Sequence, residues 1–137
     1  MSKALTIPRV LVVDDDLQML RAFARFLGDS CEVVTVECPV AGLELLRFSA
    51  QPVHIIFSDF RMPKMWGDEF LRRAKEISPV TMCVLMSGGA TDQAMARRKV
   101  DEPADKIVHK FLYKPFSMND ALALIREAAS HFSEASR

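Results

Sequence analysis

The sequence lacks a net charge and a long apolar run, and both absences exclude classes of protein. Its 137 residues include 18 lysines and arginines and 18 aspartates and glutamates, so no overall field attracts nucleic acid or an anionic membrane. The longest apolar stretches are only a few residues long, which argues against a signal peptide or a membrane span. We therefore expect a cytoplasmic protein that contacts neither nucleic acid nor a membrane directly.

Cysteine is also scarce. Cys31, Cys38 and Cys83 are odd in number and have neither CxxC nor other metal-ligand spacing. A disulfide framework and a zinc site are both poor interpretations of three such residues, so we expect buried, reduced thiols.

Half of the residues are hydrophobic, which suits one compact domain of this length. Short apolar runs rich in β-branched residues alternate with segments of helical period, and these runs are residues 10–13, 33–36, 53–57, 80–86 and 111–113. The alternation predicts an α/β fold with a five-stranded parallel sheet and helices on both faces. We place the domain at residues 9–130, between an N-terminal extension (1–8) and a C-terminal tail (131–137).

Four of the five expected helices are clearly amphipathic. The residues expected to face the sheet are Leu17, Leu20, Phe23 and Leu27, then Val40, Leu43 and Leu46, then Phe70, Ala74 and Ile77, and finally Leu122, Ile125, Ala129 and Phe132. The first helix should end at Gly28, and the last should begin at the capping residue Ser117. The remaining helix, Thr91 to Val100, has few large apolar residues and should be the most loosely packed.

Three aspartates, Asp14, Asp15 and Asp16, follow the first apolar run directly. Neighbouring carboxylates repel each other, at about 4 kcal/mol for a pair ~4 Å apart at an effective dielectric near ~20. The stretch therefore calls for a nearby cation. On its own, it is equally well explained if Asp16 caps the following helix while the other two face water.

Polar residues also follow the other predicted strands. The third run ends in Asp59, the fourth in Ser87 followed by Gly88 and Gly89, and the fifth in Lys114. Each of these alone is typical of a turn or loop. Because ligands bind outside the carboxyl ends of parallel strands, their coincidence at one sheet edge predicts a functional site.

The segments "VVDDD", "IIFSDFRMP", "LMSGG" and "FLYKPF" resemble the signature segments of receiver domains from two-component response regulators. The resemblance runs from about Arg9 to Ala129 and implies a flavodoxin-like doubly wound (βα)5 fold. The roles that it implies are the phosphoryl acceptor for Asp59, Mg²⁺ ligands for Asp14, Asp15, Asp59 and the Arg61 carbonyl, and the family's hydroxyl and lysine for Ser87 and Lys114. Mg²⁺ would supply the cation that the aspartates require, leaving Asp16 to cap the helix.

The resemblance also implies how a phosphoryl group would be read. Ser87 would move toward it, coupled to the aromatic residue Phe111 on the fifth strand, although Phe111 is also an ordinary core residue. The implied partners are a sensor histidine kinase or a phosphotransfer protein, an output protein or a missing output domain, and a second copy in a phosphorylation-dependent dimer. Receivers of this kind catalyse only their own phosphorylation and slow dephosphorylation, so we do not expect an enzyme. The resemblance also implies that the Lys114–Pro115 peptide bond is cis.

The chain departs from the family pattern in three places. Its one tryptophan, Trp66, replaces a small or acidic residue, and we expect it to pack at the surface. Arg61 and Gly89 occupy variable positions that the resemblance places beside the path of attacking water, so the lifetime of the acyl phosphate is not predictable. The segment "VDEPAD" reads as an insertion after the fourth helix.

The charges of Arg97, Arg98 and Lys99 could meet an acidic partner, but a solvated helix face is the more ordinary interpretation.

Two other functions compete with the receiver. A haloacid-dehalogenase-like phosphohydrolase would use Asp14 as its nucleophile, but Gln18 stands where that motif expects a β-branched residue or threonine. A pseudo-receiver that serves only as an interaction scaffold would keep the fold, but such domains usually lose acidic or lysine positions that this chain retains.

Overall fold

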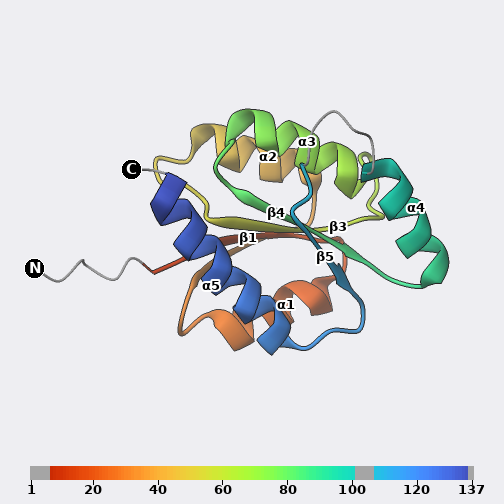
Figure 1. Ribbon diagram of the computed structural model, residues 1–137, viewed down its shortest axis with the longest axis horizontal. Helices are drawn as coiled ribbons and strands as arrows, with labels where there is room; N and C mark the ends of the chain where they lie inside the picture. The colour runs from red at the N-terminus through yellow and green to blue at the C-terminus, as the bar shows by residue number, and fades with distance from the viewer. Residues whose placement is uncertain (1–6, 101–106, 136–137) are drawn as a thin grey trace, which may run out of the picture.

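A computed structural model describes residues 7–100 and 107–135 and arranges them as alternating strands and helices around one parallel sheet (Figure 1). The strands are β1 (Arg9–Val13), β2 (Glu32–Val36), β3 (Ile55–Asp59), β4 (Met82–Ser87) and β5 (Lys110–Tyr113). The helices are α1 (Leu17–Leu27), α2 (Pro39–Phe48), α3 (Gly67–Ile77), α4 (Ala90–Val100) and α5 (Met118–Ala135). The strand order is β2-β1-β3-β4-β5, which confirms the predicted doubly wound α/β fold. Residues 101–105, most of the predicted insertion, lie outside the described part.

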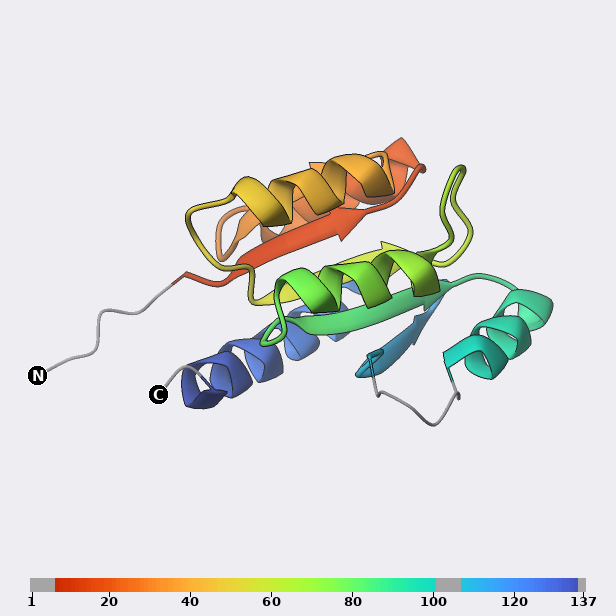
Figure 2. The same cartoon turned by 90° about the horizontal axis from the view of Figure 1, so that it is seen from above.

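The sheet separates two apolar cores because successive strand residues point to opposite faces. Val10 and Val12 of β1 contribute to the core beneath α1 and α5. Leu11 and Val13 contribute to the core beneath α2, α3 and α4. Figures 1 and 2 show α1 and α5 on one side of the sheet and α2 and α3 on the other. The runs that form β1, β3 and β4 are therefore strands buried on both faces, as parallel strands usually are, whereas the edge strands β2 and β5 are only partly buried.

The predicted helix faces are partly wrong. Leu17 and Val40 are 45% and 43% exposed. Leu17 precedes the first buried residue of α1, Leu20, whereas Val40 lies beside the buried face of α2, which Pro39, Gly42 and Leu43 form. Among residues 118–132 of α5, the buried residues are Ala121, Ile125 and Ala128. This spacing of four and three residues gives a narrower face than the leucines suggested, with Leu122 only partly buried. Helix α5 also continues to Ala135, into the segment predicted as a tail.

The ends of the helices follow the predicted capping chemistry. The Asp16 carboxylate accepts the backbone N–H of Gln18 at 3.0 Å and caps α1, which ends at Gly28. At the start of α5, Ser117 Oγ accepts the Asp120 N–H, and the Asp120 carboxylate accepts the Ser117 N–H, both at 3.2 Å. This reciprocal pair is a capping box, so the assignments of Asp16 and Ser117 to capping are confirmed.

The cysteines carry free thiols. Cys31 and Cys83 are buried as predicted, whereas Cys38 is only half-buried. Cys38 occupies the N-cap position of α2, and the backbone N–H groups of Ala41 and Val40 lower the pKa of its thiol. Among residues 7–100 and 107–135, no helix combines the length and the apolar character that a membrane crossing needs.

Two histidines that the sequence did not single out tie the amino-terminal edge of the sheet. His54 Nδ1 accepts the Arg9 N–H at 3.0 Å, and His109 Nδ1 accepts the Cys83 N–H at 2.9 Å. In each pair the backbone N–H of the histidine also donates to the backbone carbonyl of the same partner residue, at 2.9 Å. Each imidazole therefore closes a second hydrogen bond between neighbouring strands and must be unprotonated at Nδ1 to do so.

Acidification should weaken the His109 tie. Burial, then the charges of Lys75 and His131, lower the pKa of His109 from 6.5 to about 4 in the folded protein. Between these values the unfolded chain binds more protons, so the stabilisation is complete above about pH 6.5 and is lost as pH falls toward 4. A His109→Asn variant keeps an acceptor in this place but does not titrate. Urea unfolding at pH 7.5 and 5 should show the wild type losing more stability than the variant, and equal losses would contradict the assignment.

Candidate functional site

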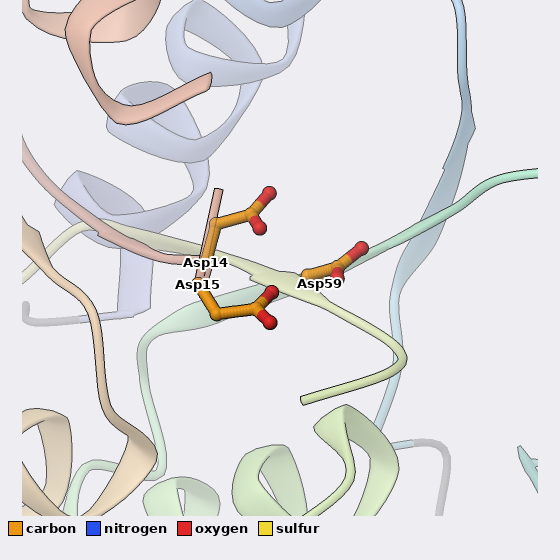
Figure 3. Close-up of side chains that lie close together, drawn as sticks. All are labelled: Asp14, Asp15 and Asp59. Atoms are coloured by element: carbon orange, nitrogen blue, oxygen red, sulfur yellow. The ribbon is translucent and has the colours of Figure 1, made fainter. Parts of the chain in front are cut away.

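Three carboxylates converge at the carboxyl edge of the sheet. Asp14 and Asp15 directly follow β1, and Asp59 is the last residue of β3, the strand that pairs with β1. Their ligating oxygens all lie within 4.8 Å of one another, and Figure 3 shows the three side chains directed toward a common region. The parallel register brings together residues that are 45 positions apart in the sequence. The predicted acidic cluster is therefore present in the fold.

Lys114 supplies the cation nearest to two of these carboxylates. Its Nζ donates to Asp59 Oδ1 at 2.9 Å and to Asp14 Oδ2 at 3.2 Å. Burial opposes the lysine charge, but the hydrogen bonds and charges of the two aspartates outweigh it and raise the Lys114 pKa. The Lys114–Pro115 peptide bond is cis, as predicted. One ammonium thus pairs with two of the three clustered carboxylates, which leaves the cluster with excess negative charge.

Burial and, to a smaller extent, this excess charge raise the pKa values of Asp14 and Asp59. Asp14 is fully buried, and burial together with the charge of Asp59 raises its pKa to about 6, although the Asp16 N–H and Lys114 act in the opposite direction. The pKa of Asp59 is also raised, first by burial and further by the charge of Asp15. A divalent cation would remove this electrostatic penalty, and hard carboxylate oxygens are suitable Mg²⁺ ligands.

Ser87 ends β4 in a position where its hydroxyl has no partner. The side chain is 1% exposed, and Oγ makes no hydrogen bond to the described residues. An unpaired buried hydroxyl costs about 1–3 kcal/mol, so an acceptor that enters the site would stabilise it. The two glycines that follow leave open space, because a Cβ added at Gly88 or Gly89 would meet no atom within 4 Å.

Phe111 lies on β5, half-buried against the core beneath α2, α3 and α4. Its ring stacks on Tyr113 with centroids 6.1 Å apart, and the Arg97 guanidinium lies over both rings, 5.2 and 5.7 Å from their centroids. Arg97 Nε also donates to the Tyr113 hydroxyl at 2.6 Å. Arg97 therefore contacts the predicted switch residue directly, while Arg97, Arg98 and Lys99 all lie on an exposed helix face, as predicted.

Arg61 and Trp66 lie in the segment that connects β3 to α3. The Arg61 guanidinium is 4.8 Å from the centre of the Trp66 ring, and Lys99 Nζ lies 4.6 Å from the same ring. Trp66 also packs edge-on against the buried Phe60, with centroids 5.2 Å apart. The half-buried Trp66 is therefore a packing residue, as expected, but its contacts with two cations could not be read from the sequence. The backbone carbonyl of Arg61 is two residues beyond Asp59, and its role toward a metal stays a prediction.

The fold and the site together define a class: a doubly wound α/β domain with an acidic, lysine-containing edge at the carboxyl ends of its strands. The sequence matches the response regulator receiver domain over residues 10–126, and the chain belongs to that family. It is therefore a receiver domain of two-component signalling, a class whose members are generally not enzymes.

Curated relatives differ in how much of their length the chain covers. Hydrogenase transcriptional regulatory protein HoxA of Cupriavidus necator is 32% identical over 87% of this chain, and DNA-binding transcriptional regulator NtrC of Escherichia coli is 30% identical over 91%. The chain spans only 23% and 25% of those two proteins. Two-component response regulator ORR3 of rice is 32% identical over 85% of this chain, which spans 87% of that relative.

Solved structures support the same fold. A structure described as adenylate cyclase from Rhodopirellula baltica has a TM-score of 0.84 and 31% identity, and the alignment covers 96% of this chain and 93% of that one. The beryllofluoride-activated NtrC4 receiver domain dimer has a TM-score of 0.73 and 28% identity, with coverage of 90% and 98%.

Asp15 and Asp16 offer a matched test of which aspartates belong to the predicted metal site. We expect Asp15→Asn to weaken Mg²⁺ binding by about tenfold or more, since even loss of an outer-shell partner costs that much at metal sites. Asp16→Asn should bind Mg²⁺ like the wild type, because asparagine caps a helix as well as aspartate does. Calorimetric titration measures both affinities. Equal losses would contradict the assignment of Asp15 to the predicted metal site and of Asp16 to the helix cap.

Proposed function

We propose that this receiver domain accepts a phosphoryl group from a phosphohistidine onto Asp59 and changes its α4–β5 surface in response. The observation that carries the proposal is the convergence of three carboxylates within 4.8 Å, with Lys114 bonded to Asp59 at 2.9 Å. Such a site can bring an anionic nucleophile and an anionic phosphoryl group together only if cations neutralise both.

The donor set fits Mg²⁺. Asp14, Asp15, Asp59 and the Arg61 carbonyl would hold the ion, which keeps several waters and needs only a few protein oxygens. When bound, Mg²⁺ would neutralise the carboxylates and stabilise negative charge on the phosphoryl oxygens. The raised pKa values of Asp14 and Asp59 are compatible with this assignment: burial is the main cause of both, and a bound cation would offset its cost to the charged carboxylates.

In the proposed transfer, a carboxylate oxygen of Asp59 attacks the phosphorus of the phosphohistidine. The P–O bond to Asp59 forms as the P–N bond breaks, and the imidazole leaves with the electron pair of that bond. Lys114, already bonded to Asp59 in the resting protein, is placed to interact with a phosphoryl oxygen. The product is an acyl phosphate, and no turnover of small phosphate esters is expected beyond slow hydrolysis of that bond.

Ser87 is the residue proposed to read the product. Its buried hydroxyl has no hydrogen-bond partner among residues 7–100 and 107–135, and a phosphoryl group adds strong acceptor oxygens at the same sheet edge. Because β4 pairs with β5, movement of Ser87 toward that group would also shift β5, which carries Phe111 and Tyr113. The proposed partners are a sensor histidine kinase or phosphotransfer protein in the cytoplasm, an output protein or output domain, and a second copy after phosphorylation.

Peptide mapping after incubation with acetyl phosphate and Mg²⁺ tests the proposal. A base-labile label on Asp59 is the expected result. A label on Asp14, with steady turnover of phosphate esters, would favour the phosphohydrolase instead, since that chemistry places the nucleophile on β1. Absence of label with every donor would favour a scaffold that keeps only the fold.

A further inference from the structure

Helix α4 is attached to the domain mainly through polar side chains. Among its residues 90–99, whose side chains are described, only Ala96 is buried, and Met95 is partly buried against the core. The helix contacts its surroundings instead through Asp92, Arg97 and Lys99. Contacts of this kind are weaker than apolar burial and respond to nearby charge. The position of α4 is therefore open to electrostatic control.

One of these contacts leads back toward Asp59. Arg61 Nε and Nη2 both donate to Asp92 Oδ1, at 3.1 and 2.9 Å, in the first turn of α4. The two side chains are 48% and 27% exposed, so the pair is only partly shielded from water. Arg61 is also the first cationic residue after Asp59 along the chain. A single arginine thus connects the segment that follows the proposed acceptor to the helix proposed to move.

We propose that Arg61 couples the charge on Asp59 to the position of α4. In the unphosphorylated protein it pairs with Asp92 and holds the start of α4; a phosphoryl group on Asp59 competes with Asp92 for the guanidinium and so releases the helix. This inference rests on the proposed function and adds a route to α4 that does not pass through Ser87 and Phe111.

The competition favours the phosphoryl group on chemical grounds. A phosphorylated side chain carries close to two negative charges and three strong acceptor oxygens, whereas Asp92 offers one charge and uses one oxygen for both bonds. The site already has more carboxylates than cations within it, so the added charge increases the demand for a further cation. Arg61 does not have to give up a strong pair, because exposed ion pairs contribute little to stability.

Linkage makes the proposal quantitative. If anion binding at Asp59 breaks the Arg61–Asp92 ion pair, part of the binding free energy is spent on breaking it, and removing Asp92 must raise the affinity for the anion by the corresponding factor. For a half-exposed ion pair that increase in affinity is about threefold. The same change should loosen α4 before any anion is added.

The test uses beryllofluoride with Mg²⁺ as the phosphoryl mimic. Affinity can be followed by the fluorescence of Trp66, the only tryptophan, whose ring lies beside the Arg61 guanidinium. Asp92→Asn should bind the mimic about threefold more tightly than the wild type. The control is Glu69→Gln, which removes the acceptor of another surface ion pair, Arg73–Glu69 at 2.6 Å on α3, whose carboxylate is more exposed than that of Asp92 (46% against 27%). It should leave the affinity unchanged.

Amide hydrogen exchange supplies a readout that needs no ligand. Asp92→Asn should exchange faster than the wild type in the first turns of α4, and the mimic should accelerate exchange there in the wild type. In an Arg61→Ala background, Asp92→Asn should change neither the affinity nor the exchange rate.

The outcomes separate the two proposals. If the wild type does not bind the mimic, the proposed function and this inference both fail. If it binds but Asp92→Asn behaves like Glu69→Gln, the inference fails and the function stands. If Asp92→Asn still tightens binding in the Arg61→Ala background, the loss of the negative charge of Asp92 favours the anion directly, and the proposed role of Arg61 is wrong.

Discussion

An Asp59→Asn variant should take up no phosphoryl group from acetyl phosphate, whereas the wild type should form a base-labile acyl phosphate. Asparagine has nearly the same shape as aspartate but lacks the carboxylate oxygen that attacks phosphorus. Phosphate release on base treatment and the mass of the intact protein measure the difference. Chelation of Mg²⁺ should abolish labelling of the wild type as well.

The same variant should fold and be at least as stable as the wild type without metal. The pKa of Asp59 is raised, so the folded protein disfavours its charged form at neutral pH. A neutral amide removes that cost, although it also loses the charge paired with Lys114. Urea unfolding at pH 7.5 measures this, and it separates loss of chemistry from loss of structure.

Asp14→Asn is the control for the position of the label. It should slow labelling through the metal while the label stays on Asp59. Labelled Asp59→Asn protein, or a label that moves to another aspartate, would contradict the proposed acceptor.

Gly67→Ala should be the most destabilising single-methyl change at the site. A Cβ at Gly67 would lie 2.1 Å from the Asp59 carbonyl oxygen and 2.9 Å from Leu85 Cδ1. Neither contact can be relieved by a side-chain rotation at residue 67, so the start of α3 must move away from β3. We expect a loss of about 3 kcal/mol in the free energy of unfolding, together with slower labelling because the end of β3 shifts with Asp59.

Gly89→Ala is the matched control for this change. Its added Cβ would meet no atom within 4 Å, so the expected effect is within about 0.5 kcal/mol. Urea unfolding of both variants makes the comparison. A Gly67→Ala protein as stable as Gly89→Ala would show that α3 is not held against β3 in the way described.

The strand ends could be predicted because each depends on local sequence. A buried β-branched run that stops at Asp14, Asp59 or Ser87 is visible in one segment, and parallel strands place those ends together whatever the loops do. Capping by Asp16 and Ser117 is equally local. The boundaries were less certain: β3 begins at Ile55, two residues after the start of the predicted run, because Val53 and His54 are buried although they precede the strand.

The contacts around α4 could not be predicted for the opposite reason. Arg61 and Asp92 are separated by 31 residues, and nothing in either segment indicates the other. The same holds for Arg97 on Tyr113 and for the two histidine ties, which depend on how helices and strands meet in three dimensions. Residue patterns that report burial do not report which long polar side chain reaches which partner.

The loop after β3 contains one further constraint. Lys64 has a φ of 73°, and the Met65 N–H donates to the Pro63 carbonyl at 2.8 Å across it, which describes a tight turn of the rare, strained γ type. Glycine, asparagine and aspartate tolerate this backbone far better than β-branched residues do. Lysine adopts this backbone here, but a β-branched residue at position 64 would add steric strain to the turn. A homologue with valine or isoleucine there must route its loop differently, and the placement of its neighbours, Arg61 and Trp66 among them, should not be carried over from this chain.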